Sequence, residues 1–216
     1  MVPALVLAAG RSSRMGRAKA LLPLGGDTFL SRIVRTFLAA GVDDVVVVVG
    51  HDAEAIVGAF PSELPVRFVE NRGYDRGQLS SLLTGLAVID RPGVRAMLVT
   101  LVDVPLVTPA TVRAVIDRYR QTHAPVVRPT SGSRHGHPLI IDRSLFDALR
   151  GADAEAGAKP IVRTHASPAG DVEIEDEGAF VDVDTIEEYE RLVLNGRAGA
   201  HPGGGAAGPA AETSTG

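Results

Sequence analysis

Five consecutive valines in the segment "DDVVVVVG", at residues 43–50, limit the fold of this chain more than any other feature. β-Branched residues favour strands, and a strand without polar alternation is buried on both faces, as in a parallel sheet covered by helices. Similar apolar runs occur at residues 3–8, 66–70 and 96–102. Together with residues 44–49, they predict four strands of a mostly parallel sheet.

Stretches with helical spacing alternate with these strands, at residues 28–40, 53–60 and 78–89. Gly41 is suited to end the first of these helices, and Asp52 to begin the second. Thr108 and Pro109 predict the start of another helix, because threonine caps helices and proline fits the first turn. This alternation indicates a three-layer α/β/α, Rossmann-like domain.

The second half of the chain is less regular. Its apolar runs predict strands at residues 124–129, 137–141 and 170–175, and helices at residues 144–149 and 185–194, the last capped by Thr185. From Arg197 onward the chain is rich in Gly, Ala and Pro and has little to bury, which is typical of disorder. We therefore expect one domain over residues 1–196 and a disordered, low-complexity tail over residues 197–216.

Composition narrows the range of partners. The 216 residues are 45% hydrophobic with a formal net charge of -4, which is typical of a globular protein and argues against a nucleic-acid or membrane-surface binder. Cysteine is absent, so disulfides, thiolate zinc sites and a cysteine nucleophile are excluded. The sequence also lacks the patterns of a transmembrane segment and of a signal peptide. We therefore expect a cytoplasmic protein.

A basic loop, "LAAGRSSRMGRAK" at residues 7–19, follows the first predicted strand. In open parallel sheets, such a loop points backbone N–H groups into the crevice where ligands bind. Its cationic side chains add donors suited to a polyphosphate: Arg11, Arg14, Arg17 and Lys19. The glycine spacing matches neither the P-loop nor the Gly-x-Gly-x-x-Gly dinucleotide fingerprint. A solvated surface loop is the alternative interpretation.

Acidic residues occur where they could meet this loop. Asp103 follows the strand predicted at residues 96–102, and the carboxyl ends of parallel strands lie at one edge of a sheet. A carboxylate there could hold Mg²⁺ beside phosphates, because Mg²⁺ takes oxygen ligands. Asp182 and Asp184, just before the last predicted helix, are further candidates. For each aspartate, the alternative is a role in a turn or a helix cap.

Four segments resemble, in order, the motifs of the MobA/MocA-like nucleotidyltransferase family: "LAAGRSSRMGRAKALLPLGG", "VDVPLVTP", "GHPLII" and "VDVDTIEEY". The resemblance covers about residues 1–195. It implies an enzyme that moves a nucleoside monophosphate from an NTP to a phosphorylated acceptor and releases pyrophosphate, with Mg²⁺, or Mn²⁺ in its place. A phosphate monoester is already ionised at neutral pH, so this chemistry needs no dedicated base.

The family's motifs carry over onto particular residues of this chain. By this resemblance, Gly10, Arg14 and Lys19 hold the triphosphate, and Arg14, Lys19 and Asp103 are the catalytic residues. Asp103 also binds the metal ion, and Asp184 completes the metal site, with Asp182 as the reserve candidate for that role.

The resemblance also indicates the nucleotide. Family members that use CTP tend to read Leu-Ala-Ala-Gly, whereas guanylyl transferases tend to read Leu-Ala-Gly-Gly, and Ala9 therefore indicates CTP. Its methyl group narrows the space near the base, which favours a pyrimidine. The segment "RGQLSSLLTGL" resembles the part of the family that lies over the nucleoside. It implies that Gly77 and Ser81 approach the base or ribose and that Gln78 assists them. The alternative interpretation is a helix start at which a serine such as Ser80 caps the first turn. The predicted nucleotide-binding residues are Leu7, Ala8, Ala9, Gly10, Arg11, Arg14, Lys19, Gly77 and Ser81.

The Gly-His-Pro at residues 136–138 resembles the acceptor-side motif of molybdenum cofactor cytidylyltransferases. It implies that the acceptor is molybdopterin carrying molybdenum, with His137 and Lys159 as acceptor contacts and His135 in a turn. The segment around Lys159 departs from the family's Gly-Asp-Lys motif. A molybdenum hydroxylase or its chaperone is then a candidate partner.

Three other functions remain open at this point. Some relatives are NAD(P)H-dependent reductases of the nicotine-blue type, although the missing dinucleotide fingerprint counts against that activity. The same fold also hosts transferases that use another NTP or another acceptor. The third alternative is a non-catalytic protein that delivers the cofactor.

Overall fold

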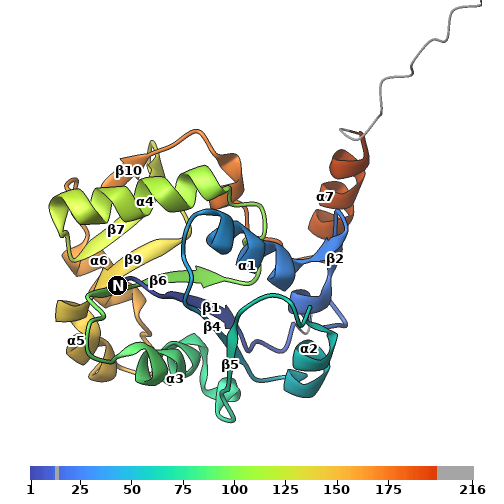
Figure 1. The fold of residues 1–216 in the computed structure, drawn as a ribbon, viewed down its shortest axis with the longest axis horizontal. Helices are drawn as coiled ribbons and strands as arrows, with labels where there is room; N and C mark the ends of the chain where they lie inside the picture. Colours follow the sequence, from blue (N-terminus) through green and yellow to red (C-terminus); the bar gives the residue numbers. More distant parts are fainter. Residues whose placement is uncertain (13–14, 199–216) are drawn as a thin grey trace, which may run out of the picture.

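The computed structural model describes residues 1–12 and 15–198, and it has a central sheet between two layers of helices (Figure 1). The strands lie in the order β10-β7-β9-β6-β1-β4-β5, and β8 pairs with β7 off this path. Their bounds are β1 (Ala4–Ala8), β4 (Val45–Val49), β5 (Arg67–Glu70), β6 (Ala96–Leu101), β7 (Val126–Ser131), β8 (Arg134–His135), β9 (Leu139–Asp142) and β10 (Asp171–Glu173). The predicted three-layer α/β/α fold is confirmed.

The sheet is mostly parallel. β1 pairs in parallel with β4 on one side and β6 on the other, and β5 continues the parallel set beside β4. β9 runs antiparallel to both β6 and β7. The carboxyl ends of β1, β4, β5 and β6 therefore lie at one edge, which is where ligands bind in sheets of this kind.

The helices connect these strands, and most begin where the sequence predicts. They are α1 (Phe29–Ala39), α2 (Ala53–Ala59), α3 (Gln78–Ile89), α4 (Pro109–Thr122), α5 (Phe146–Arg150), α6 (Lys159–His165) and α7 (Ile186–Ala198). Thr28 and Thr108 cap α1 and α4 through their side-chain oxygens. Asp52 precedes α2 as predicted, but it has a left-handed backbone (φ 57°) and makes no side-chain capping bond.

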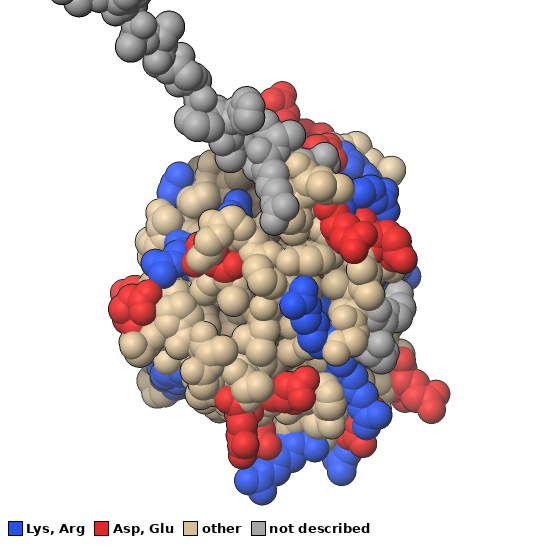
Figure 2. Space-filling view, turned by 90° about the vertical axis from the view of Figure 1, so that its right-hand side faces the viewer, with Lys and Arg blue, Asp and Glu red and all other residues tan. Residues whose placement is uncertain are grey.

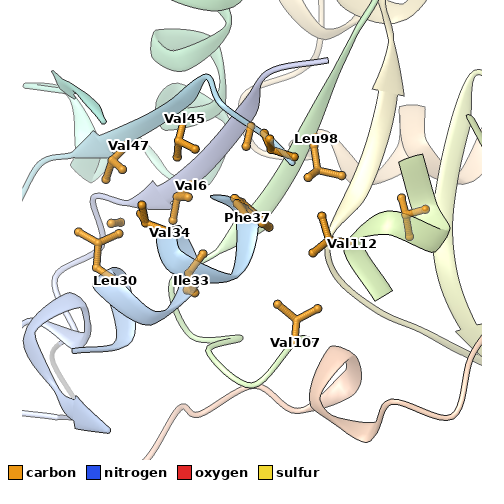
Figure 3. Close-up of a cluster of buried hydrophobic side chains, with 14 of the residues drawn as sticks. Val6, Leu30, Ile33, Val34, Phe37, Val45, Val47, Leu98, Val107 and Val112 are labelled. Atoms are coloured by element: carbon orange, nitrogen blue, oxygen red, sulfur yellow. The ribbon is translucent and has the colours of Figure 1, made fainter. Parts of the chain in front are cut away.

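Alternate residues of the central strands pack into two hydrophobic cores, one on each face of the sheet. On one face, the side chains of Val6 and Val47 pack with residues of α1 and α4, as Figure 3 shows. On the other face, Leu5, Leu7 and Val48 pack with α3 and α5. Burial on both faces explains why these strands are apolar without alternation.

The structure differs from the sequence predictions at several boundaries. A turn of 3-10 helix, Arg143–Leu145, precedes α5, so the helix predicted at residues 144–149 is shorter. The short helix α6 and the hairpin β2 (Pro23–Leu24) with β3 (Asp27–Thr28) are additional elements. The helix α7 extends to Ala198, two residues into the predicted tail, and residues 199–216 lie outside the described part of the chain. Within the described residues, no helix has the length and apolar character required to cross a membrane.

Candidate functional site

A cleft of about 330 Å³ opens at the edge of the sheet where β1 and β6 end. Figure 2 shows the side of the molecule on which α2 and α7 lie, where acidic and basic side chains are interspersed around a largely uncharged centre. The cleft is lined by Leu7, Ala9, Gly10, Ser12, Met15, Lys19, Tyr74, Gly77, Gln78, Ser81, Leu101, Val102, Asp103 and Asp184. Most of the residues that the sequence singled out therefore share one cavity.

The loop after β1 turns back so that Lys19 faces the cleft. Ser12 adopts a left-handed backbone conformation (φ 48°), and its carbonyl oxygen accepts the N–H of Met15 at 2.8 Å. The Ser12 side-chain oxygen accepts the backbone N–H of Lys19 at 3.1 Å. Apart from its chain neighbours, no atom of the described residues lies within 4 Å of the place that a Cβ at Gly10 would occupy, so the space above this backbone is open. Arg14 lies outside the described residues.

Lys19 forms ion pairs with both of the predicted metal-binding aspartates, Asp103 and Asp184. Its Nζ lies 2.5 Å from Oδ1 of Asp184 and 3.4 Å from Oδ2 of Asp103. The Lys19 side chain is only 11% exposed, whereas that of Asp184 is 43% exposed. The other oxygen of Asp103, Oδ1, is buried without a hydrogen-bond partner among the described residues. The basic loop and two aspartates far apart in the sequence therefore converge.

The backbone around Asp184 is fixed by the start of α7. The N–H groups of Asp184 and Thr185 donate to the Glu188 carboxylate at 2.8 and 2.9 Å, and the N–H of Glu188 donates to the Thr185 side chain at 3.2 Å. This reciprocal capping box begins α7 at the predicted cap, Thr185. The N–H of Val183 also donates to the carbonyl oxygen of Asp103 at 2.8 Å. The two aspartates are thus held side by side through the backbone.

His137 and Asp182 lie close enough to Asp103 to influence each other electrostatically. Burial lowers the pKa of His137, against the opposing effects of the Val99 backbone and the two aspartates. Its Nδ1 is buried without a hydrogen-bond partner in the described part of the chain. Partial burial and the charge of Asp103 raise the pKa of Asp182. Burial therefore favours the uncharged forms of His137 and Asp182 beside Asp103.

The other end of the cleft is formed by the segment between β5 and α3. Tyr74 begins a 3-10 turn, and Gly77, at φ 96°, precedes the first residue of α3. Ser81 is buried and accepts a hydrogen bond from Asn71 at 3.0 Å. Gly77, Gln78 and Ser81 were predicted near the nucleoside, but Tyr74 was missed, because an aromatic residue in an irregular connection carries no periodic signal.

Several predicted residues lie elsewhere. Ala8 points into the hydrophobic core with Val6, because successive side chains of a strand face opposite sides, so only its backbone can border the cleft. Arg11 is exposed, and its guanidinium carbon lies 5.7 Å from the centre of the Tyr74 ring. Arg17 lies over Tyr189 in α7. Lys159 is exposed at the start of α6, and Figure 1 shows α6 on the side where β1 begins.

The acidic residues of the cleft fit a divalent ion bound together with phosphate. Carboxylate oxygens are the donors that Mg²⁺ and Mn²⁺ take, and Oδ1 of Asp103, which is buried and has no hydrogen-bond partner among the described residues, suits such a bond. Within the described residues, no cluster of three or more His, Cys, Asp or Glu side chains could hold a metal ion. Asp103 and Asp184 therefore fit a site whose remaining ligands are phosphate oxygens and water.

A parallel sheet with a basic, glycine-containing loop and paired carboxylates at its carboxyl edge defines a nucleotide-binding α/β protein. Residues 4–169 match the MobA-like NTP transferase domain, and the chain belongs to this nucleotidyltransferase family. The family indicated by the four sequence motifs is confirmed.

The chain is also similar to individual proteins, three of which follow. It is 33% identical over 205 residues to nicotine blue oxidoreductase of Paenarthrobacter nicotinovorans, covering 89% of this chain and 96% of that protein. It is 34% identical over 151 residues to a probable molybdenum cofactor guanylyltransferase of Mycobacterium bovis, covering 67% and 70%. The solved structure of Rv0371c from Mycobacterium tuberculosis, in complex with manganese, has a TM-score of 0.73 and 29% identity, covering 89% of this chain and 98% of that one.

Proposed function

We propose that this protein is a Mg²⁺-dependent cytidylyltransferase, with Mn²⁺ as an alternative metal, that transfers CMP from CTP to the molybdopterin cofactor carrying molybdenum. The observation that carries the proposal is the contact of Lys19 with both Asp103 and Asp184 inside the cleft. A cation between two carboxylates, beside a glycine-containing loop, is an arrangement suited to a metal-bound triphosphate.

The proposed step is an in-line displacement. A phosphate oxygen of the acceptor attacks the α-phosphorus of CTP, a new P–O bond forms, and the bond to the bridging oxygen breaks, so that pyrophosphate leaves with the electron pair. The acceptor phosphate is ionised at neutral pH, because its second pKa is about 6, and it needs no base. A bound divalent ion supplies charge neutralisation on the phosphates. Lys19 and Arg14 donate hydrogen bonds to the departing group.

The preference for CTP rests on Ala9. Ala9 is among the residues that line the cleft and is 4% exposed, and its methyl group fills space that a glycine would leave open. A pyrimidine needs less room than a purine at such a wall. In this proposal Leu7, Ala9, Gly10, Gly77 and Ser81 bind the nucleotide together with the backbone of Ala8, while Arg11 reaches it from the rim.

For the acceptor side we propose His137, whose buried Nδ1 lies in the neighbourhood of Asp103. Lys159 is exposed at the start of α6, on the side of the molecule where β1 begins (Figure 1), and we propose no role for it. The cytidylated cofactor would pass to a molybdenum hydroxylase or its chaperone.

A second candidate function is an NAD(P)H-dependent reduction. It is favoured by the 33% identity to nicotine blue oxidoreductase over nearly the whole of both chains. The absence of Gly-x-Gly-x-x-Gly from the loop after β1 counts against it.

One experiment separates these functions. The protein is incubated with Mg²⁺ or Mn²⁺, each of the four NTPs and molybdenum-loaded molybdopterin, and pyrophosphate release is followed; a parallel sample follows NAD(P)H absorbance. Pyrophosphate with CTP supports the proposal, whereas release with GTP alone contradicts the base assignment. NAD(P)H consumption without pyrophosphate would identify a reductase, and nucleotide binding without turnover would identify a delivery protein.

A further inference from the structure

Tyr74 and His51 have no role in the function proposed above, yet they meet beside the cleft. The Nδ1 of His51 and the Tyr74 hydroxyl are 3.4 Å apart, and the ring centres are 5.8 Å apart at a tilt of 53°. Arg11 approaches the same tyrosine ring to 5.7 Å. Three connections, after β1, β4 and β5, thus contribute one side chain each to a small aromatic and cationic group.

Tyr74 is held close to the residue that borders the base. A Cβ added to Gly50 would lie 2.7 Å from Cβ of Tyr74 and 2.9 Å from Cβ of Ala9, so both side chains pack directly against this glycine. The N–H of His51 donates to the carbonyl oxygen of Ala9 at 3.2 Å. Tyr74 and Ala9 therefore pack against the same glycine and form adjacent parts of one wall.

The sheet order shows which part of a nucleotide this wall would face. Asp103 follows β6, Ala9 follows β1, His51 follows β4 and Tyr74 follows β5. Because the order is β6-β1-β4-β5, Asp103 and Tyr74 follow strands on opposite sides of β1. Neighbouring strands are about 4.8 Å apart, so β6 and β4 are separated by about 10 Å. A triphosphate near Asp103 would thus direct its nucleoside toward Tyr74.

We propose that Tyr74 is a specificity-determining residue whose ring packs against the nucleoside and, with Ala9, limits the site to a pyrimidine. His51 is a positioning residue that holds the tyrosine ring through its contact with the hydroxyl. The guanidinium of Arg11 also packs against this ring. This inference rests on the function proposed above, because it needs a nucleotide whose phosphates lie beside Asp103. An aromatic ring stacks on any base, so the selection comes from the limited space and not from stacking itself.

The test is isothermal titration of CTP and GTP, with Mn²⁺ present, into the wild-type protein and single variants. Tyr74→Ala removes the ring, Tyr74→Leu keeps a smaller, apolar side chain in case the alanine variant is unfolded, and Tyr74→Phe removes only the hydroxyl. Arg72→Ala is the matched control, because Arg72 is 89% exposed and does not line the cleft. Circular dichroism melting checks that each variant is folded.

We expect Tyr74→Ala and Tyr74→Leu to weaken CTP binding about tenfold. GTP binding should weaken less or improve, so the CTP-to-GTP affinity ratio falls. Tyr74→Phe should stay close to wild type, since the ring remains. A wild-type preference for CTP that persists unchanged in folded Tyr74→Ala and Tyr74→Leu would overturn this inference and leave the proposed function intact. A wild-type protein that binds no CTP, or prefers GTP, would overturn both.

Discussion

Asp103 is the residue on which the proposed chemistry depends most. In the part of the chain that the structure describes, its Oδ1 is buried without a hydrogen-bond partner, and its Oδ2 lies 3.4 Å from Nζ of Lys19. We expect Asp103→Ala to lower pyrophosphate release by roughly two to three orders of magnitude, the usual loss for one strong electrostatic group. The melting temperature should change little, because this carboxylate serves the ligand. Asp117→Ala, at an exposed residue of α4, is the control. A folded Asp103→Ala protein with wild-type turnover would reject the assignment.

Lys19 should have opposite effects on metal and nucleotide binding. In the absence of ligands it neutralises Asp184 and Asp103, at the position where a divalent ion would meet both carboxylates. We expect Lys19→Met to bind Mn²⁺ severalfold more tightly without nucleotide, because the competing cation is gone. CTP binding should weaken, because a phosphate donor is lost. Electron paramagnetic resonance of free Mn²⁺ measures the first effect and calorimetry the second. Equal Mn²⁺ affinity in both proteins would contradict the idea that Lys19 and the metal ion compete for the two carboxylates.

Which single residues could be predicted from the sequence depended on whether they lie in motifs. Gly10, Lys19 and Asp103 were found because a glycine, a lysine and a strand-end aspartate have recognisable chemistry at those places. Ala8 was assigned to the nucleotide by motif, although strand alternation turns its side chain into the core. His51 was not identified, since its partner Tyr74 is 23 residues away and only the fold brings them together.

The short turn η4 (Glu177–Phe180) that leads to Asp184 is tied to the start of α4 by one carboxylate. Asp176 accepts hydrogen bonds from the N–H of Thr108 at 2.9 Å, the side chain of Thr111 at 2.5 Å and the N–H of Gly178 at 3.1 Å. Burial alone would raise the pKa of Asp176, but these hydrogen bonds outweigh it and hold the pKa below its usual value. The charged form is therefore the one that stabilises this connection.

We expect Asp176→Asn to destabilise the protein by roughly 1–2 kcal/mol at neutral pH, because hydrogen bonds to a charged acceptor are lost. Since the folded-state pKa is depressed, the wild-type advantage is complete above about pH 4 and declines as the pH falls further. Urea unfolding of both proteins between neutral pH and pH 2 measures this difference. Curves that stay parallel down to the lowest pH would show that the Asp176 charge contributes nothing.

Helices with a long apolar pattern and clear end residues could be predicted from the sequence, whereas short helices without them could not. Helix α3 begins and ends where predicted, because an apolar helical pattern runs without interruption from Gln78 to Ile89. Helix α6 was missed because it is seven residues long, has a proline in its first turn and buries no residue. Asp52 precedes α2 but does not cap it, because its left-handed backbone gives its side chain no capping bond.

The cleft as a whole is assembled from four distant parts of the chain. The loop after β1, the end of β6, the start of α3 and the segment before α7 each contribute lining residues. The order of the parallel strands could be expected from the alternating pattern, and with it the convergence of strand ends at one edge. The position of Asp184 could not be derived in this way, because it depends on the irregular segment after β10. Asp184 could be predicted only from its resemblance to a family motif.

Because these parts meet only at the cleft, a ligand that contacts several of them should stabilise the entire fold. Nucleotide should draw Lys19 away from Asp103 and Asp184, and the metal should then meet two carboxylates and phosphate oxygens together. We expect CTP plus Mn²⁺ to raise the melting temperature by more than the sum of the two separate shifts, measured by differential scanning fluorimetry. In Asp184→Asn the excess should vanish, whereas Asp117→Ala should retain it. Additive shifts in the wild-type protein would mean that nucleotide and metal bind independently, and that the contacts of Lys19 do not couple them.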